Sequence, residues 1–215
     1  MADFQVYIIE SPAPEDVYER WGEGEMIRES LRLADIPATV RVALDEEHFV
    51  KALREGLSEL MQKKNLMPVL HVSAHGNEKG IELSDGRFIE WSLFGQITAS
   101  LNGHLGGELL VCVSSCNSFN CARHALSGTN PWKVIVGNTG EPTWNDTIIA
   151  FSAFYHLLAK GKTIQEAVQG MCTASGNSDF KSADAQAVRA VNEKLAILPP
   201  ERRERIARAI AEMIK

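Results

Sequence analysis

Short apolar runs recur along the first two-thirds of the chain, and stretches with a helical pattern separate them. The runs have the length of β-strands, and they cover residues 4–9, 39–44, 67–73, 108–114 and 133–137. The run at 67–73 is apolar enough to be buried on both faces of a sheet. Repeated alternation of strand and helix predicts an α/β fold of three layers, with a mainly parallel sheet and helices on both of its faces.

The segments between these runs carry apolar residues three or four positions apart, which is the spacing of an amphipathic helix. Residues 16–34 show this pattern as one long helix, and Asp45 is placed to cap the next one. The apolar stripe of that next helix is Phe49, Leu53, Leu57, Leu60 and Met61. An Asp-Gly turn predicts a small hairpin within residues 80–90, and a further helix is expected around residues 94–101.

The last third of the chain is helical in pattern. Residues 145–159 predict one helix, and Thr163 with Glu166 forms the capping box of the next. Beyond Asp179 we expect two more amphipathic helices, divided at the proline pair 199–200.

Length and composition set the domain organisation. The chain has 215 residues, of which 45% are apolar and 23% charged, as in an ordinary soluble globular protein. This length suits one compact domain. We expect that domain over residues 1–178, with residues 179–215 as a C-terminal helical extension packed on it or continuous with it.

Charge and segment pattern narrow the classes of function. The net charge of −6 and the pI near 5.6 argue against a broad basic surface, so no nucleic-acid partner is expected. No apolar run approaches the length of a membrane span, and residues 1–10 do not resemble a signal peptide, so no membrane association is expected. The four cysteines are unevenly spread, unlike a disulfide framework, which indicates a reducing cytoplasm.

Two of the predicted strands end in residues that can perform covalent chemistry together. The strand at 67–73 runs into His75 and Gly76, and the strand at 108–114 runs into Cys116. Because ligands bind beyond the carboxyl ends of parallel strands, both side chains should emerge at the same edge of the sheet. A histidine beside a cysteine forms the nucleophile and base of covalent catalysis.

Nucleophilic catalysis by a thiol requires a base beside the cysteine and room for the reacting carbonyl group. A thiol with its usual pKa of about 8.5 is mostly protonated at neutral pH, and a nearby imidazole makes it reactive. A glycine directly after the histidine leaves room for the scissile carbonyl. The backbone N–H groups of Gly76 and Cys116 are suitable donors to an oxyanion. Neither a metal nor an organic cofactor is required.

These segments resemble the clan of caspase-like cysteine peptidases, which includes caspases, metacaspases, separase and CHAT domains. The resemblance lies in Val69-Leu70-His71-Val72-Ser73-Ala74-His75-Gly76 followed by Leu109-Leu110-Val111-Cys112-Val113-Ser114-Ser115-Cys116. In that clan one apolar strand precedes His-Gly, and a second precedes a small residue and Cys. The 41-residue separation of His75 and Cys116 is similar to that of the clan.

The downstream sequence is similar to CHAT domains in particular. An aromatic pair lies in the helical segment 151–158, followed by Gly161 and the short helical segment at 166–168. The resemblance covers about residues 4–175 and leaves out the closing helices. The Gln-Ala-Cys-x-Gly sequence of caspases proper is absent, so their aspartate specificity is not carried over.

The resemblance implies a caspase-like fold and a cysteine endopeptidase that performs limited, regulatory proteolysis. Cys116 would be the nucleophile, His75 the general base and then acid, and Gly76 a donor to the oxyanion. The expected partners are a protein or peptide substrate and a regulatory protein.

Three residues after the fifth predicted strand are candidates for binding the substrate. Glu141 and Asp146 lie in the loop expected near the cleft, where a carboxylate would select a basic P1 side chain. Trp144 would form a wall of that pocket. The alternatives are that Asp146 or Glu141 serves the N-terminus of the following helix, and that Trp144 packs beneath the loop.

Other functions compete with peptidase activity. Cys116, Cys121 and His124 supply three zinc ligands without a paired C-x-x-C motif. A catalytically silent signalling or scaffold module could use the same fold. The polar loop 138–140 would suit a small-molecule ligand. His71 either orients His75 from the same side of its strand or is a core histidine.

Overall fold

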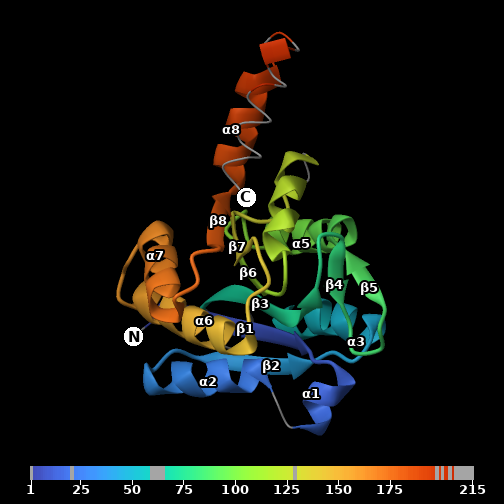
Figure 1. Cartoon of the computed structure of the whole chain (residues 1–215), viewed down its shortest axis with the longest axis vertical. Coiled ribbons are helices and arrows are strands. Elements are labelled where there is room, and N and C mark those ends of the chain that lie inside the picture. The colour runs from blue at the N-terminus through green and yellow to red at the C-terminus, as the bar shows by residue number, and fades with distance from the viewer. Residues whose placement is uncertain are drawn as a thin grey trace.

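A computed structural model of the chain describes residues 2–19, 22–58, 66–127, 130–196, 199, 201–202 and 205. Strands and helices alternate along it and surround a mostly parallel sheet (Figure 1). The predicted α/β class is therefore confirmed.

The central sheet follows the order β2-β1-β3-β6-β7-β8. Its strands are β1 (Phe4–Ser11), β2 (Ala38–Val42), β3 (Met67–Gly76), β6 (Leu110–Ser114), β7 (Val134–Asn138) and β8 (Phe180–Asp184). The first five are parallel to their neighbours, and β8 pairs antiparallel with β7. The predicted hairpin is present as β4 (Gly80–Glu82) and β5 (Phe88–Glu90), and it extends from the end of β3.

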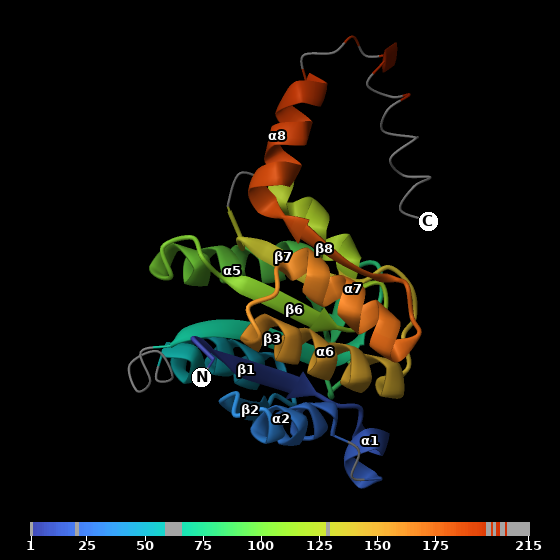
Figure 2. The same ribbon diagram turned by 90° about the vertical axis from the view of Figure 1, so that its left-hand side faces the viewer.

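Helices cover both faces of the sheet. On one face lie α2 (Glu23–Leu33), α6 (Trp144–Ala159) and α7 (Ile164–Ser175), and Figure 2 shows α6 and α7 in front of the strands. The other face carries α3 (Glu46–Lys51), the π-helical turn η1 (Ala52–Gly56), α5 (Trp91–His104) and the 3-10 helix η2 (Ser118–Ser127). Each face has its own apolar core, so the arrangement has the three layers that the sequence predicts.

The side chains of β3 alternate between these two cores, as those of a doubly covered strand must. Leu70 and Val72 pack toward α3 and α5. Val69 packs toward α6, and His71 on the same side contacts Phe151 edge-on with ring centroids 4.6 Å apart. The same alternation directs Ser73 and His75 toward the α2 and α6 face.

The predicted local signals for helix starts are confirmed. The Asp45 side chain accepts a hydrogen bond from the His48 N–H at the start of α3. Thr163 and Glu166 form the reciprocal capping box of α7. In the apolar stripe of the α3 segment, Phe49, Leu53 and Leu57 are buried; Leu60 and Met61 lie outside the described residues.

The single helix predicted over residues 16–34 is wrong, because the structure has two. The short α1 (Pro14–Tyr18) precedes α2, which starts only after Gly22 in an extended conformation. The Glu10 side chain, from the end of β1, accepts the N–H of Gly24 at 3.1 Å. This long-range contact fixes the start of α2, and an amphipathic pattern does not reveal it.

The prediction of helix directly after Asp179 is also wrong. Phe180 begins the edge strand β8, and its ring is 1% exposed against Phe151. The helix α8 (Ala185–Ala196) starts only after that strand, and it projects from the body in Figures 1 and 2. The expected boundary at residue 178 therefore falls just before a strand of the central sheet. The helix predicted after the proline pair lies outside the described residues, apart from Glu201, Arg202 and Arg205.

The burial of Phe180 predicts that β8 is part of the folding unit. Phe180→Ala should lower the free energy of unfolding by about 3–5 kcal/mol, because it empties a closed site in the core. Lys181→Ala, on the exposed side of the same strand, should change it by less than about 0.5 kcal/mol. Urea denaturation measures both. Equal, small effects would show that β8 does not belong to the cooperative core.

Candidate active site

The register of β3 and β6 brings the candidate histidine and cysteine to one edge of the sheet. His71 pairs with Cys112, and Ser73 pairs with Ser114, which is the last paired position between the two strands. His75 and Cys116 each lie two residues beyond that last pair. The two predicted residues therefore follow adjacent parallel strands at the same edge.

His75 is held by two neighbours that are remote in sequence. Its Nε2 lies 3.2 Å from Oδ2 of Asp16 in α1. Its ring meets the Trp144 ring edge-on, with centroids 5.4 Å apart. The side chain is 45% exposed, so solvent reaches the imidazole.

The contact with Asp16 selects the tautomer of His75. An ionised carboxylate only accepts hydrogen bonds, so the ring proton of neutral His75 resides on Nε2 and the lone pair on Nδ1. The same Oδ2 accepts the backbone N–H of Ala13 at 3.1 Å, which fixes the carboxylate. Nδ1 is therefore the ring atom available to take a proton.

Cys116 lies in a tight turn at the end of β6. Asn117 has a φ of 55°, in the left-handed region, and its N–H donates to the Gly140 carbonyl at 2.8 Å. The Ser118 hydroxyl donates to the Val113 carbonyl at 3.0 Å and accepts the N–H of Asn138 at 2.9 Å. These bonds fasten the cysteine turn to the loop after β7.

The surroundings of Cys116 disfavour its thiolate. Partial burial raises the pKa of the thiol, and the negative charge of Glu141 raises it further. Within the described part of the chain, His75 bonds to Asp16 and no hydrogen bond joins it to Cys116. Cys116 is therefore a neutral thiol at neutral pH. Catalytic hydrogen bonds often form only when substrate is bound.

Gly76 has a steric reason to lack a side chain. A Cβ at this position would lie 2.9 Å from the Gly80 carbonyl oxygen and 3.0 Å from the Ser115 Oγ. The hairpin and the cysteine turn thus close around the residue after His75. This close packing holds the Gly76 backbone beside the turn that carries Cys116.

The three predicted substrate-binding residues have different surroundings. Glu141 is exposed and near enough to Cys116 to act on its pKa. Asp146 forms a capping box with Thr143, so one of its oxygens serves the start of α6, as one of the alternatives proposed. Trp144, the first residue of α6, packs against His75.

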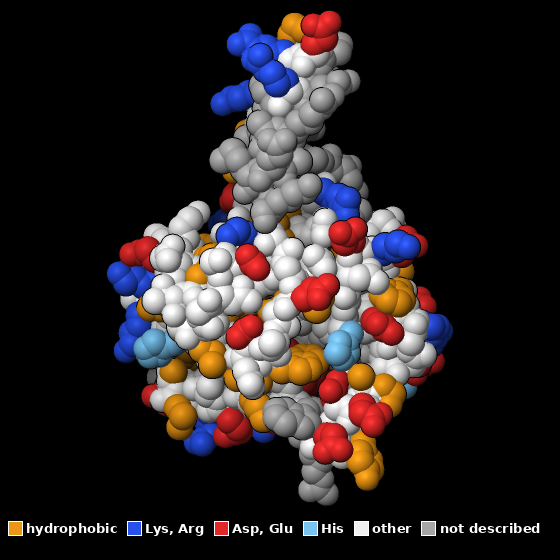
Figure 3. Space-filling view, viewed as in Figure 1, with side chains coloured by type: hydrophobic (Ala, Val, Ile, Leu, Met, Phe, Trp, Pro, Cys, Tyr) orange, Lys and Arg blue, Asp and Glu red, His pale blue; other side chains and the backbone are white. Residues whose placement is uncertain are grey.

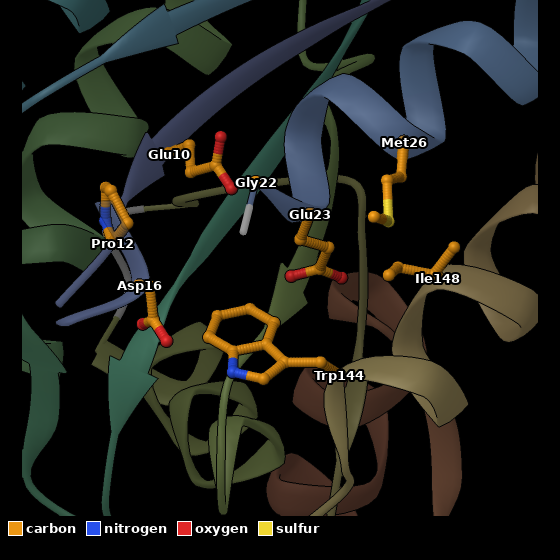
Figure 4. A pocket seen from close by; sticks show the side chains of 8 residues that line it. All are labelled: Glu10, Pro12, Asp16, Gly22, Glu23, Met26, Trp144 and Ile148. Carbon is orange, nitrogen blue, oxygen red and sulfur yellow. The ribbon is translucent and has the colours of Figure 1, made fainter. Parts of the chain in front are cut away.

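A cluster of carboxyl groups lies beside the candidate pair and is not evident from the sequence pattern. It surrounds a cavity with room for about one water molecule (Figure 4). We call it the carboxylate pocket; its lining residues are Glu10, Pro12, Asp16, Gly22, Glu23, Met26, Trp144 and Ile148. Asp16 and Trp144 belong both to this pocket and to the surroundings of His75.

Glu23 is the most buried acid of the pocket. The residue is 3% exposed and accepts the Ser73 hydroxyl at 2.5 Å and the Ser114 hydroxyl. Burial raises its pKa to about 7, opposed by these hydrogen bonds and one from Thr147, while the charge of Glu10 adds to the rise. Burial also raises the pKa of Glu10.

Sequence reasoning missed Asp16, Glu10 and Glu23 for different reasons. Asp16 follows the turn after the first strand, and its place at the carboxyl end of a parallel strand is a usable signal. Glu10 shares that position at the end of β1. Glu23 gives no such signal, because only the packing of α2 brings it to the sheet edge.

His71 and two of the other cysteines belong to the core. The His71 Nδ1 lies 2.7 Å from the Tyr155 hydroxyl, and full burial lowers the pKa of His71 to about 3. Its ring packs edge-on against Phe151 and is fully buried, so the core interpretation holds. Cys112 and Cys121 are buried, and burial raises the pKa of Cys112 to about 12.

The geometry of the described residues does not add support for a zinc site or for a small-molecule site in the loop 138–140. Across the described ranges, no three His, Cys, Asp or Glu side chains are grouped as metal ligands; the His124 side chain lies outside them. In the polar loop, the Asn138 Oδ1 accepts the Gly140 N–H at 2.7 Å, and Thr139 donates to the Asp179 carbonyl. These groups serve the loop itself.

Acidic side chains are prominent on one face of the molecule. In Figure 3 they occupy the central part of the face, beside apolar side chains and a histidine, while Lys and Arg lie toward the periphery. This distribution matches the net charge of −6 and favours the approach of cationic segments.

No protein-family model matches the sequence, and a search of curated proteins finds no significant similarity. No helix within the described residues is long and apolar enough to cross a membrane.

The Asp16 contact predicts a measurable effect on Cys116. Asp16→Asn should slow alkylation of Cys116 by iodoacetamide at pH 7 by up to about five-fold, because a partly exposed ion pair contributes about 1 kcal/mol at most. Peptide mass spectrometry distinguishes Cys116 from the other cysteines. Glu15→Gln, an exposed neighbour in α1, is the matched control and should react like the wild type. Equal rates in all three proteins would show that Asp16 does not influence the pair.

The buried Glu23 predicts a specific dependence of stability on pH. Since its pKa is about 7 in the folded protein and near 4.5 when unfolded, the folded state holds the extra proton between these values. The stability from this group is complete below about pH 4.5 and is lost as the pH rises through 7. His71, with a lowered pKa, acts in the opposite direction and loses its contribution as the pH falls below 6.5.

Glu23→Gln isolates the first of these effects, since His71 is common to both proteins. The unfolding free energy of the wild type minus that of Glu23→Gln should fall by roughly 2–3 kcal/mol from pH 5 to pH 8. Urea denaturation at several pH values measures this difference. A difference that is constant with pH would contradict the raised pKa.

Proposed function

We propose that the chain is a cysteine endopeptidase with a caspase-like, CHAT-like domain, in which Cys116 is the nucleophile and His75 the general base. The single observation that carries the proposal is the β3–β6 register, which brings both residues to one edge of the sheet. Each lies two positions beyond the last pair of the two strands, Ser73 and Ser114. The Asp16 carboxylate on His75 Nε2 adds support, because it leaves Nδ1 free to accept the thiol proton.

The reaction has two halves. In the first, His75 takes the thiol proton, the Cys116 sulfur bonds to the scissile carbonyl carbon, and the carbonyl oxygen becomes an oxyanion. The C–N bond then breaks, and the His75 imidazolium protonates the departing amine, which leaves a thioester. In the second, His75 takes a proton from water, and the hydroxide bonds to the thioester carbon. The C–S bond then breaks, and the His75 imidazolium returns its proton to the departing sulfur. A carboxylic acid and the regenerated thiol are the products.

The elevated pKa of Cys116 gives His75 a defined task. A thiol whose burial and acidic neighbour oppose ionisation needs a base at the moment of attack. The Asp16 carboxylate would stabilise the imidazolium that results. The N–H groups of Gly76 and Cys116 would then donate to the oxyanion, as the approach of Gly76 to the cysteine turn favours.

The substrate class follows from the surface and the loop after β7. A protein or peptide is proposed, because the site lies at an open sheet edge with a half-exposed His75. The charge of Glu141 near Cys116 favours a basic residue at P1. All four cysteines are free, which fits a reducing compartment such as the cytoplasm.

One observation favours the rival function, a catalytically silent signalling or scaffold module. Among the described residues no hydrogen bond joins His75 to Cys116, and the pKa of the Cys116 thiol is raised rather than lowered. A module of this kind would use the α/β body to bind a regulatory protein partner. Both functions share the fold, so reactivity of Cys116 separates them.

Cleavage of a mixed peptide library, read by mass spectrometry, tests the peptidase function. The wild type should produce cuts that Cys116→Ala and His75→Ala reduce by at least about 100-fold, since general-base catalysis alone contributes that factor. Basic residues should predominate at P1, and Glu141→Gln should weaken that preference. Cys172→Ala, which changes a partly buried cysteine on α7 that contacts the Phe180 carbonyl, is the control and should cleave normally.

The outcome that contradicts the peptidase function is also defined. A folded wild type that makes no cuts, and whose Cys116 alkylates at the same rate with and without His75, is not this enzyme. If labelling of Cys116 depends on His75 but no peptide in the library is cut, the library lacks the sequence that the peptidase recognises.

A further inference from the structure

The two strand ends that carry the candidate pair are joined by one buried side chain from a different layer. Glu23, the first residue of α2, accepts hydrogen bonds from Ser73 of β3 at 2.5 Å and from Ser114 of β6. One carboxyl oxygen binds each serine, so the carboxyl group bridges neighbouring strands. It does so on the side of the sheet toward which His75 also points.

The bridge lies where the backbone ladder between the two strands stops. Ser73 and Ser114 are the final paired residues of β3 and β6. Beyond them β3 pairs with the hairpin strand β4, and β6 turns into η2. The Glu23 carboxyl group therefore links the two strands at their last paired position. His75 and Cys116 each lie two residues beyond that position.

A third element lies beside the same carboxyl group. Thr147, one turn into α6, is near enough to Glu23 to lower its pKa. The Thr147 hydroxyl donates to the carbonyl of Trp144, the residue that packs on His75. Glu23 thus bonds to the strand of His75 and to the strand of Cys116, and it lies beside the helix that carries Trp144.

A purely local role for Glu23 does not account for these contacts. The N-terminus of α2 already receives a carboxylate, because Glu10 accepts the Gly24 N–H. Burial of a second carboxyl group beside it is unfavourable, as the raised pKa of Glu23 shows. A residue that served only α2 would be stable in solvent. Its burial is explained by the serines that it joins.

We propose that Glu23 is a positioning residue of the site: its carboxyl group ties the ends of β3 and β6 and thereby sets the distance between His75 and Cys116. This role rests on the proposed function, in which the two side chains act as a pair. Glu23 touches neither the reacting atoms nor the substrate. It acts through Ser73 and Ser114.

The pH profile of Cys116 alkylation by iodoacetamide tests the role without requiring a peptide substrate. His75→Ala should slow the reaction at pH 7 and move the profile to higher pH, since the base is gone. Glu23→Ala should move the profile toward that of His75→Ala, with a rate at pH 7 about ten-fold below the wild type. Glu23→Gln, which keeps a side chain able to bond both serines, should stay within about three-fold of the wild type.

The matched control is Glu10→Gln. Glu10 is equally buried and serves the same end of α2, yet it bonds to neither serine. Its profile should coincide with that of the wild type. If Glu10→Gln and Glu23→Ala shift the profile equally, the effect comes from α2 as a whole, and the positioning role is wrong.

Two further variants keep the test valid if Glu23→Ala does not fold. Ser73→Ala and Ser114→Ala each remove one of the two hydrogen bonds to the Glu23 carboxyl group. Each should shift the alkylation profile in the same direction as Glu23→Ala, by a smaller amount. Wild-type profiles in both serine variants would overturn the proposal.

The two proposals fail differently. If His75→Ala reacts like the wild type, no catalytic pair exists, and the peptidase function and the positioning role are both wrong. If His75→Ala differs from the wild type but Glu23→Ala, still folded by circular dichroism, does not, the pair is retained and only the positioning role is wrong.

Discussion

The burial of the Glu23 carboxyl at the edge of the sheet constrains most of the surrounding structure. A carboxyl group that is 3% exposed must find hydrogen-bond donors, and here they come from Ser73 of β3 and Ser114 of β6. The requirement holds the first turn of α2 against these two strands. It also explains why serines, rather than apolar residues, precede His75 and Cys116 at positions that face this layer.

Two acidic side chains lie beside the candidate pair and differ in what they face. Glu141 opposes ionisation of Cys116, whereas the Asp16 carboxylate faces the imidazole of His75. Partial burial and negative charge therefore both disfavour the thiolate of Cys116. Such a cysteine differs from one that forms a permanent thiolate–imidazolium pair.

Much of the fold could be predicted, because its signals are local. Each of these signals involves only residues that are close in sequence. Examples are the strand-length apolar runs, the cap at Asp45 and the capping box at Thr163. The candidate pair was also accessible, since residues after two strands of a parallel sheet must share an edge. The strand at Phe180 and the break before α2 were predicted wrongly. In each case the conformation depends on a remote partner, the Phe151 ring for one and the Glu10 carboxyl for the other.

The sequence by itself determined the α/β class, the layers and the two strand ends that carry His75 and Cys116. Hydrophobic periodicity and strand order are enough for these, because burial of apolar surface dominates folding and has a simple pattern. Only the tertiary structure decided which acids lie around the two strand ends. Asp16, Glu10 and Glu23 look like ordinary charged residues along the chain. Their roles depend on hydrogen bonds and desolvation, which act over a few ångströms and are fixed only when α1 and α2 pack against the sheet edge.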